Sequence, residues 1–183
     1  MKTLWMFLSL MTCSLTLFAT PAQVILIRHA EKPDKGVSLS KQGFERAAAF
    51  VPFFTLPPAN SAFQLPVAIY AMVTSKNHSS TRCVQTVGPL ASALGIPLIA
   101  QYTWGDYKAM VDAINQDSDY EGKTVMICWE HKGLGDIAAY FGVKPTPVYG
   151  SVYDRLWVID FDDGNFSSFQ DLPQQLMYGD TTT

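Results

Sequence analysis

The chain has 183 residues, of which 48% are hydrophobic and 16% are charged, and its formal net charge is −3. This length suits one domain with a substantial core, and the composition excludes an intrinsically disordered chain. Because the charge is small and no basic stripe runs along the sequence, nucleic acid is not expected as a partner.

The N-terminal 22 residues predict a secretory signal peptide. Lys2 precedes an apolar run from Leu4 to Phe18, and small residues follow from Thr20 to Ala22. This order of charge, apolar centre and small residues is typical of exported proteins, and the run is shorter than the ~20 residues that span a bilayer. We expect cleavage near Ala22, a mature domain of residues 23–183 in the periplasm or outside the cell, and no stable membrane span after cleavage. The alternative is an uncleaved N-terminal anchor.

Strand-like and helix-like patterns alternate through the rest of the chain. Apolar runs predict buried strands, and helical spacing predicts helices between them. The expected strands cover 24–28, 67–73, 96–102 and 124–129. The expected helices cover 40–54, 80–94 and 106–116, and a fourth begins near Gly135. A hairpin is expected over 155–172, with its turn at Asp163-Gly164. Alternation of this kind predicts an α/β fold, a three-layer sandwich with a mostly parallel sheet and helices on both faces.

The helix expected over 40–54 has one apolar face. Phe44, Ala47, Ala48 and Val51 recur at helical intervals and are expected to face the core, with Ser40 as N-cap.

The mature chain keeps two cysteines, Cys83 and Cys128. Each lies in an apolar pattern, so we expect buried free thiols, although an exported protein could also pair them.

Charged and polar residues follow three of the predicted strands. Arg28 and His29 follow the first strand, and Arg82 opens the helix after the second. Glu130 and His131 follow the strand over 124–129. Because open α/β sheets bind ligands at the carboxyl ends of their strands, we expect these side chains to share one site.

These residue types suit phosphoryl transfer. Arginine binds phosphoryl oxygens with a planar fork that stays cationic. A neutral imidazole can attack phosphorus and form a covalent intermediate, and neighbouring cations disfavour its protonated form.

The sequence resembles the histidine phosphatase superfamily, whose fold is phosphoglycerate mutase-like. Four segments carry the resemblance in order: "LIRHAEKP", "LSKQGFERAAAF", "SSTRCVQTVGPLASALG" and "VMICWEHKGLGDIA". The resemblance implies a mostly parallel α/β sandwich that needs neither a metal ion nor another cofactor.

The resemblance also implies a role for each matching residue. His29 would be the phosphorylated nucleophile, Arg28 and Arg82 would bind the phosphoryl group, and His131 would be the second histidine of the pocket. The partner would be a small phosphorylated substrate or a phosphorylated component of the cell envelope.

The chain departs from the family pattern at two points. Ala30 stands where the commonest signature has glycine. No acid stands directly after the second histidine, so the proton donor to the leaving group is either Glu130, which we favour, or Asp106.

The sequence therefore predicts an exported, metal-independent phosphatase that hydrolyses a phosphomonoester through a phosphohistidine on His29. Two alternatives stay open: a catalytically inactive member of the fold that binds a phosphorylated ligand, and a phosphatase of phosphohistidine in proteins.

His78, Trp104 and the segment over 53–66 are expected to have structural roles. His78 is expected in an exposed polar loop, and Trp104 in core or rim packing. The segment over 53–66 is expected to shape the rim of the pocket.

Overall fold

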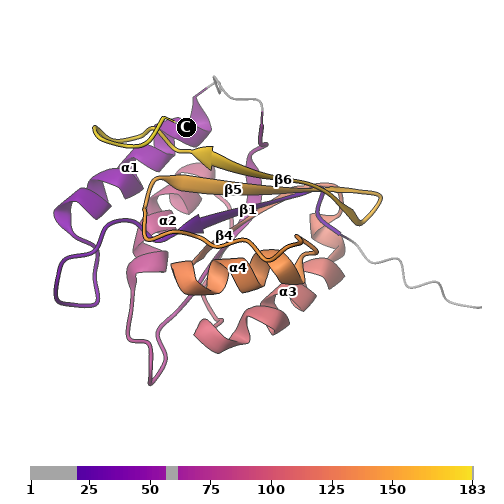
Figure 1. Ribbon diagram of the computed structural model, residues 1–183, viewed down its shortest axis with the longest axis horizontal. Helices are drawn as coiled ribbons and strands as arrows, with labels where there is room; N and C mark the ends of the chain where they lie inside the picture. The colour runs from indigo at the N-terminus through magenta and orange to yellow at the C-terminus, as the bar shows by residue number, and fades with distance from the viewer. Residues whose placement is uncertain (1–19, 57–61, 183) are drawn as a thin grey trace, which may run out of the picture.

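The computed structural model describes residues 20–56 and 62–182, so most of the expected signal peptide lies outside the described residues. Six strands of the described chain form one sheet in the order β3-β2-β4-β1-β5-β6 (Figure 1). Their bounds are β1 (Gln23–Arg28), β2 (Pro66–Ala71), β3 (Leu98–Ile99), β4 (Thr124–Trp129), β5 (Arg155–Asp162) and β6 (Asn165–Pro173). Strands β1 to β4 are parallel, whereas β5 and β6 are antiparallel to their neighbours, which confirms the mostly parallel sheet.

Helices cover both faces of this sheet. Their bounds are α1 (Lys41–Thr55), α2 (Arg82–Leu94), α3 (Tyr107–Gln116) and α4 (His131–Tyr140), with short 3₁₀ helices η1 (Trp104–Asp106) and η2 (Ser118–Tyr120). The chain crosses the sheet in one direction from β1 to β3 and then returns to β4. Because such crossovers are right-handed, α1 and α2 pack together on one face, and α3 and α4 on the other (Figure 1). The predicted three-layer sandwich is confirmed.

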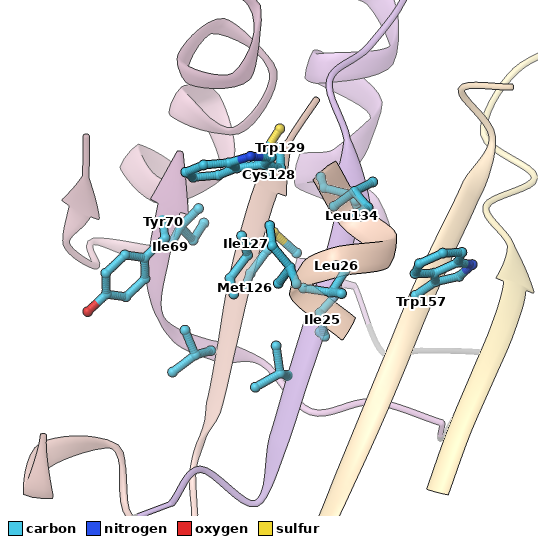
Figure 2. Close-up of a cluster of buried hydrophobic side chains, with 14 of the residues drawn as sticks. Ile25, Leu26, Ile69, Tyr70, Met126, Ile127, Cys128, Trp129, Leu134 and Trp157 are labelled. Carbon is cyan, nitrogen blue, oxygen red and sulfur yellow. The ribbon is translucent and has the colours of Figure 1, made fainter. Parts of the chain in front are cut away.

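The centre of the sheet is buried on both faces. Every residue of β1 and of β4 is buried. Figure 2 shows their aliphatic side chains lying beside those of β2, with Leu134 of α4 near Leu26 and Trp157 of β5 further to the right. A strand that is covered on both sides has no exposed face, which explains why these segments are apolar throughout.

The hairpin and the third helix also match their predictions. Asp163 and Gly164 both have positive φ, 46° and 77°, as a two-residue turn between twisted strands requires. The spacing in 106–116 predicts a face of Tyr107, Met110, Val111 and Ile114; α3 buries the last three, and Tyr107 is half-buried.

The buried face predicted for α1 is wrong except at Ala47. Phe44 is 48% exposed, and the helix buries Gly43, Arg46, Ala47, Phe50 and Phe54. Two contacts with Glu31 decide this rotation: a Cβ on Gly43 would overlap the Glu31 carbonyl oxygen, and Arg46 turns inward to bind the Glu31 carboxylate. Ser40 caps the helix as predicted, because its hydroxyl accepts a hydrogen bond from the Gly43 amide.

Helix α4 begins at His131, four residues before the predicted start near Gly135. The glycine at 133, which reads as a turn in the sequence, lies in the first helical turn against the Trp129 ring. A Cβ there would lie 2.8 Å from Trp129 Cδ1, so close packing explains this glycine. His131 consequently lies at the N-terminus of a helix, where backbone N–H groups lack helical partners.

The segment over 53–66 does not shape the rim where the structure describes it. The Gln23 side chain donates to the Ala62 carbonyl (3.1 Å) and accepts from the Gln64 amide (2.9 Å). Since Gln23 is the first residue of β1, this contact lies at the end of the sheet opposite to the expected site.

Within the described residues, no helix combines the length and apolar content needed to cross a bilayer.

Candidate active site

The five predicted site residues come together at the carboxyl ends of the central strands. Arg28 ends β1 and pairs in register with Trp129, which ends the neighbouring β4. His29 follows Arg28, and His131 follows β4 by two residues. The guanidinium groups of Arg28 and Arg82 and the ring of His131 all lie close enough to help lower the pKa of His29.

The His29 side chain is a neutral imidazole whose Nε2 is unprotonated. The side chain is 3% exposed, and its Nδ1 lies 2.7 Å from the Ala30 carbonyl oxygen. Because a carbonyl oxygen only accepts, Nδ1 carries the ring proton and Nε2 keeps its lone pair. Burial, strengthened by the nearby cations, lowers the pKa of His29 from 6.5 to about 4, so the ring is neutral at pH 7.

Arg28 is a buried cation without a carboxylate partner among the described residues. Its Nη1 donates to the carbonyls of Ser151 (2.5 Å) and Val152 (3.0 Å), and its Cζ lies 3.9 Å from the centre of the Tyr153 ring. The Nε atom is buried and has no hydrogen-bond partner there. Burial lowers the pKa of this guanidinium. An anion beside Arg28 would supply both the missing charge and the missing acceptor.

Arg82 is oriented by carbonyl groups of the loop after β1. Its Nε donates to the Ser38 carbonyl (3.1 Å), and its Nη2 to the Gly36 carbonyl. Within the described part of the chain it forms no ion pair with a carboxylate. Its positive charge is thus available to an anion at the start of α2.

Gln85 and Thr86, which follow Arg82 in the segment "RCVQT", hold two loops of the site in place. The Gln85 side chain accepts from the Leu39 amide (2.9 Å) and contacts the Ser38 hydroxyl, which holds the loop that orients Arg82. The Thr86 hydroxyl accepts from the Ala30 amide (2.9 Å), directly after the candidate nucleophile.

Of the two candidate acids, Glu130 faces the site. Its Oε1 lies 2.9 Å from His131 Nδ1, and its Oε2 accepts from Trp104 Nε1 (3.2 Å). Burial and the charge of Arg28 lower the pKa of His131. Asp106 is exposed, and its carboxylate accepts hydrogen bonds from the amide (2.9 Å) and hydroxyl (2.6 Å) of Thr103, which lower its pKa. Asp106 therefore caps η1.

A cavity of about 480 Å³ adjoins these groups. Arg82 and Glu130 belong to its wall, together with Met72, His78, Ser80 and Trp104. The rings of His78 and Trp104 stack at 5.1 Å between centroids with an interplanar angle of 10°. The sequence did not predict this pair, although both residues follow strand ends, after β2 and β3.

A buried ionic network supports the nucleophile loop from behind. Arg46 binds Glu31, two residues after His29, at 2.7 Å, and it binds Asp180 of the C-terminal segment at 2.7 Å. Arg46 also donates to Gln174 (3.0 Å). The sequence predicted none of these contacts, because they join residues up to 134 positions apart.

The two cysteines lie behind the site. Cys83 and Cys128 are both free and buried, which confirms the predicted thiols. Burial raises the pKa of Cys128 well above its ordinary value, so this thiol is not a nucleophile at neutral pH.

The comparison with known proteins supports the fold. No protein-family model matches the chain, and no curated protein matches its sequence. The solved structure of the protein histidine phosphatase SixA complexed with tungstate matches with a TM-score of 0.58 at 14% identity, over 83% of this chain and 97% of that chain. Phosphoglycerate mutase from Bacillus anthracis str. Sterne matches with a TM-score of 0.57 at 11% identity, over 83% of this chain and 92% of that chain.

These likenesses define the fold class. The chain has the same fold as these two proteins, the phosphoglycerate mutase-like fold that the resemblance in its sequence predicted.

Proposed function

We propose that the chain is a phosphatase that hydrolyses a phosphomonoester through a phosphohistidine on His29. One observation carries the proposal: a buried neutral imidazole with a free Nε2 lies among two guanidinium groups that have no carboxylate partner in the described chain. An imidazole in this state is a nucleophile, and the unpaired cations suit the charge of a phosphoryl group.

The phosphoryl group would bind between the strand ends. Arg28 and Arg82 would hold its oxygens, and the first turn of α4 would add backbone N–H groups and the His131 ring. Because two arginines supply the positive charge that phosphoryl transfer needs, we propose that the reaction is metal-independent.

The reaction would then proceed in two steps. His29 Nε2 forms a bond to phosphorus while the bond from phosphorus to the alcohol oxygen breaks, and protonated Glu130 gives its proton to that oxygen. A water molecule next attacks phosphorus and gives a proton to the Glu130 carboxylate while the bond from nitrogen to phosphorus breaks. Phosphate leaves, and both side chains return to their starting states.

The fold comparison is consistent with this chemistry. One solved protein of the same fold is a protein histidine phosphatase complexed with tungstate, a tetrahedral oxyanion like phosphate.

The substitution of His29 tests the proposal. We expect the wild-type protein to hydrolyse p-nitrophenyl phosphate and His29→Ala to lose about 10³-fold or more of kcat, because no other group replaces the nucleophile. Rapid acid-free quenching with ³²P-labelled substrate should trap label on the wild-type protein and not on the variant. Asp106→Asn is the matched control, since Asp106 lies in the η1 cap, and it should keep wild-type activity.

Three results would argue against this function. Wild-type activity in His29→Ala would show that His29 is not the nucleophile. Absence of turnover from pH 4 to 9, with phosphate still raising the Tm, would favour the inactive ligand-binding alternative. Turnover of a phosphohistidine peptide but of no phosphomonoester would favour a phosphatase of phosphohistidine in proteins.

We also propose that the protein is exported, on the strength of its N-terminal sequence. Ala22 is hydrogen-bonded to the sheet through its amide to Lys123 (2.9 Å) and through its carbonyl to Phe161 (2.9 Å). A cut before Thr20 would keep these bonds, and a cut after Ala22 would remove them. The intact mass of the exported protein distinguishes the two sites, and a retained Met1 would contradict cleavage.

A further inference from the structure

The cavity beside the phosphoryl site has a wall that the proposed reaction does not yet explain. The wall contains the stacked pair His78 and Trp104, and Trp104 contacts the proposed proton donor Glu130. The inference below rests on the proposed function, because it concerns the substrate of that same site.

The Glu130 carboxylate accepts a hydrogen bond from one side chain and lies against a second one. Trp104 Nε1 donates to Oε2 at 3.2 Å, and His131 Nδ1 lies 2.9 Å from Oε1. The Glu130 side chain is 22% exposed, so it lies at the boundary of the cavity. Without these contacts a glutamate side chain would occupy several rotamers, and its carboxyl group would face the substrate only part of the time.

Trp104 is in turn held in place by a second ring. His78 stacks on it with nearly parallel planes, and the two rings come from separate loops, after β2 and after β3. The stack thus packs one face of the indole whose Nε1 donates to Glu130.

The size of the cavity indicates what it can take. A volume of about 480 Å³ lies within the range of about 300–1,000 Å³ that is usual for small-molecule sites. Arg82 lines the cavity together with Glu130 and Trp104, so an alcohol esterified to a phosphoryl group on Arg82 can extend into it.

We propose that this cavity is the leaving-group subsite for the alcohol of a small alkyl phosphomonoester, and that Trp104 is the positioning residue that holds Glu130 toward the departing oxygen. An alkyl alcohol is a poor leaving group and needs a proton as its bond to phosphorus breaks, whereas a nitrophenolate leaves without one. An acid fixed in the cavity wall is thus useful for alkyl esters and nearly irrelevant for activated aryl esters.

The variant Trp104→Phe tests the positioning role, because it keeps an aromatic ring and removes the N–H donor. We expect kcat/KM for glycerol 3-phosphate or glucose 6-phosphate to fall about 10-fold, and kcat/KM for p-nitrophenyl phosphate to stay within about 2-fold. Glu130→Gln should show the same selectivity with a larger loss, about 10²-fold or more on the alkyl ester.

Trp129→Phe is the matched control. Trp129 is buried, and its Nε1 has no hydrogen-bond partner among the described residues, so its replacement removes an indole N–H that donates to no other described residue. We expect Trp129→Phe to change the rates on both substrates by the same factor.

A second pair of variants covers the case in which Trp104→Phe fails to fold. His78 is exposed, so His78→Ala should fold, loosen the stack and lower kcat/KM for the alkyl ester several-fold. His78→Phe restores a stacking ring and should restore that rate.

Distinct outcomes separate this proposal from the proposed function. Equal loss on alkyl and aryl esters in Trp104→Phe, or no loss on either, would overturn the positioning role. A wild-type protein that hydrolyses p-nitrophenyl phosphate but no alkyl ester, or that prefers a phosphohistidine peptide, would overturn the subsite while the phosphatase stands. Absence of activity on every substrate would instead overturn the proposed function.

Discussion

Two arginines of this protein are almost completely buried, and their surroundings differ in kind. Arg46 is 2% exposed and binds two carboxylates, those of Glu31 and Asp180. Arg28 is 4% exposed and has two backbone carbonyls and an aromatic ring beside it, with Nε unpartnered among the described residues.

The pKa shifts of the two guanidinium groups run in opposite directions. Hydrogen bonds and charge from Asp180 and Glu31 raise the pKa of Arg46 despite its burial. Burial lowers the pKa of Arg28, and the nearby Tyr153, Tyr149 and Glu130 offset that effect only in part. A buried cation with paired charge holds a structure together, whereas one without a counter-charge is suited to an anionic ligand.

The largest expected effect is on stability, at Arg46. In Arg46→Met we expect the free energy of unfolding to fall by about 3–5 kcal/mol, because Glu31 and Asp180 are left buried without compensation. Urea denaturation measures the change. Lys41→Met on the same helix is the control, since Lys41 forms an exposed 3.9 Å pair with Glu45 and should change stability by about 0.5 kcal/mol or less. A loss below about 1 kcal/mol in Arg46→Met would show that the network is not structural.

The next effect is on activity, at Arg28. In Arg28→Met we expect kcat to fall about 10²–10³-fold, because one donor to the transferring group is lost. The free energy of unfolding should fall less than in Arg46→Met, and inorganic phosphate should raise the Tm of the wild type but not of the variant. Equal destabilisation by the two substitutions would erase the distinction between these arginines.

The third effect concerns the pH dependence of stability, at His29. Its pKa is about 4 in the folded protein and 6.5 in the reference state, so the unfolded chain binds more protons between these pH values. We expect the wild type to lose about 3 kcal/mol of unfolding free energy, relative to His29→Asn, as the pH falls from about 6.5 to about 4. Parallel stability curves for the two proteins would show that His29 is not held as a buried neutral ring.

Much of the fold could be predicted from local patterns. Strands β1 and β4 are apolar throughout because both of their faces are covered, and Ser40 and Gly95 mark helix ends through the backbone geometry that they favour. The face of α1 could not be predicted in this way. Arg46 counts as a polar surface residue in any hydropathy pattern, and the carboxylates that draw it inward lie elsewhere in the chain.

The candidate site also has a part that could be predicted from sequence and a part that could not. The sequence by itself determined that Arg28, His29, Arg82, Glu130 and His131 would meet, because each follows or precedes an element in a pattern whose topology brings strand ends to one edge. Tertiary structure alone decided which acid faces the site, that His78 stacks on Trp104, and that Asp180 supports the nucleophile loop. The physical reason is that local periodicity and the rules for parallel sheets suffice to bring strand ends to one edge. Side-chain pairing between distant segments instead depends on distances that exist only in the folded chain.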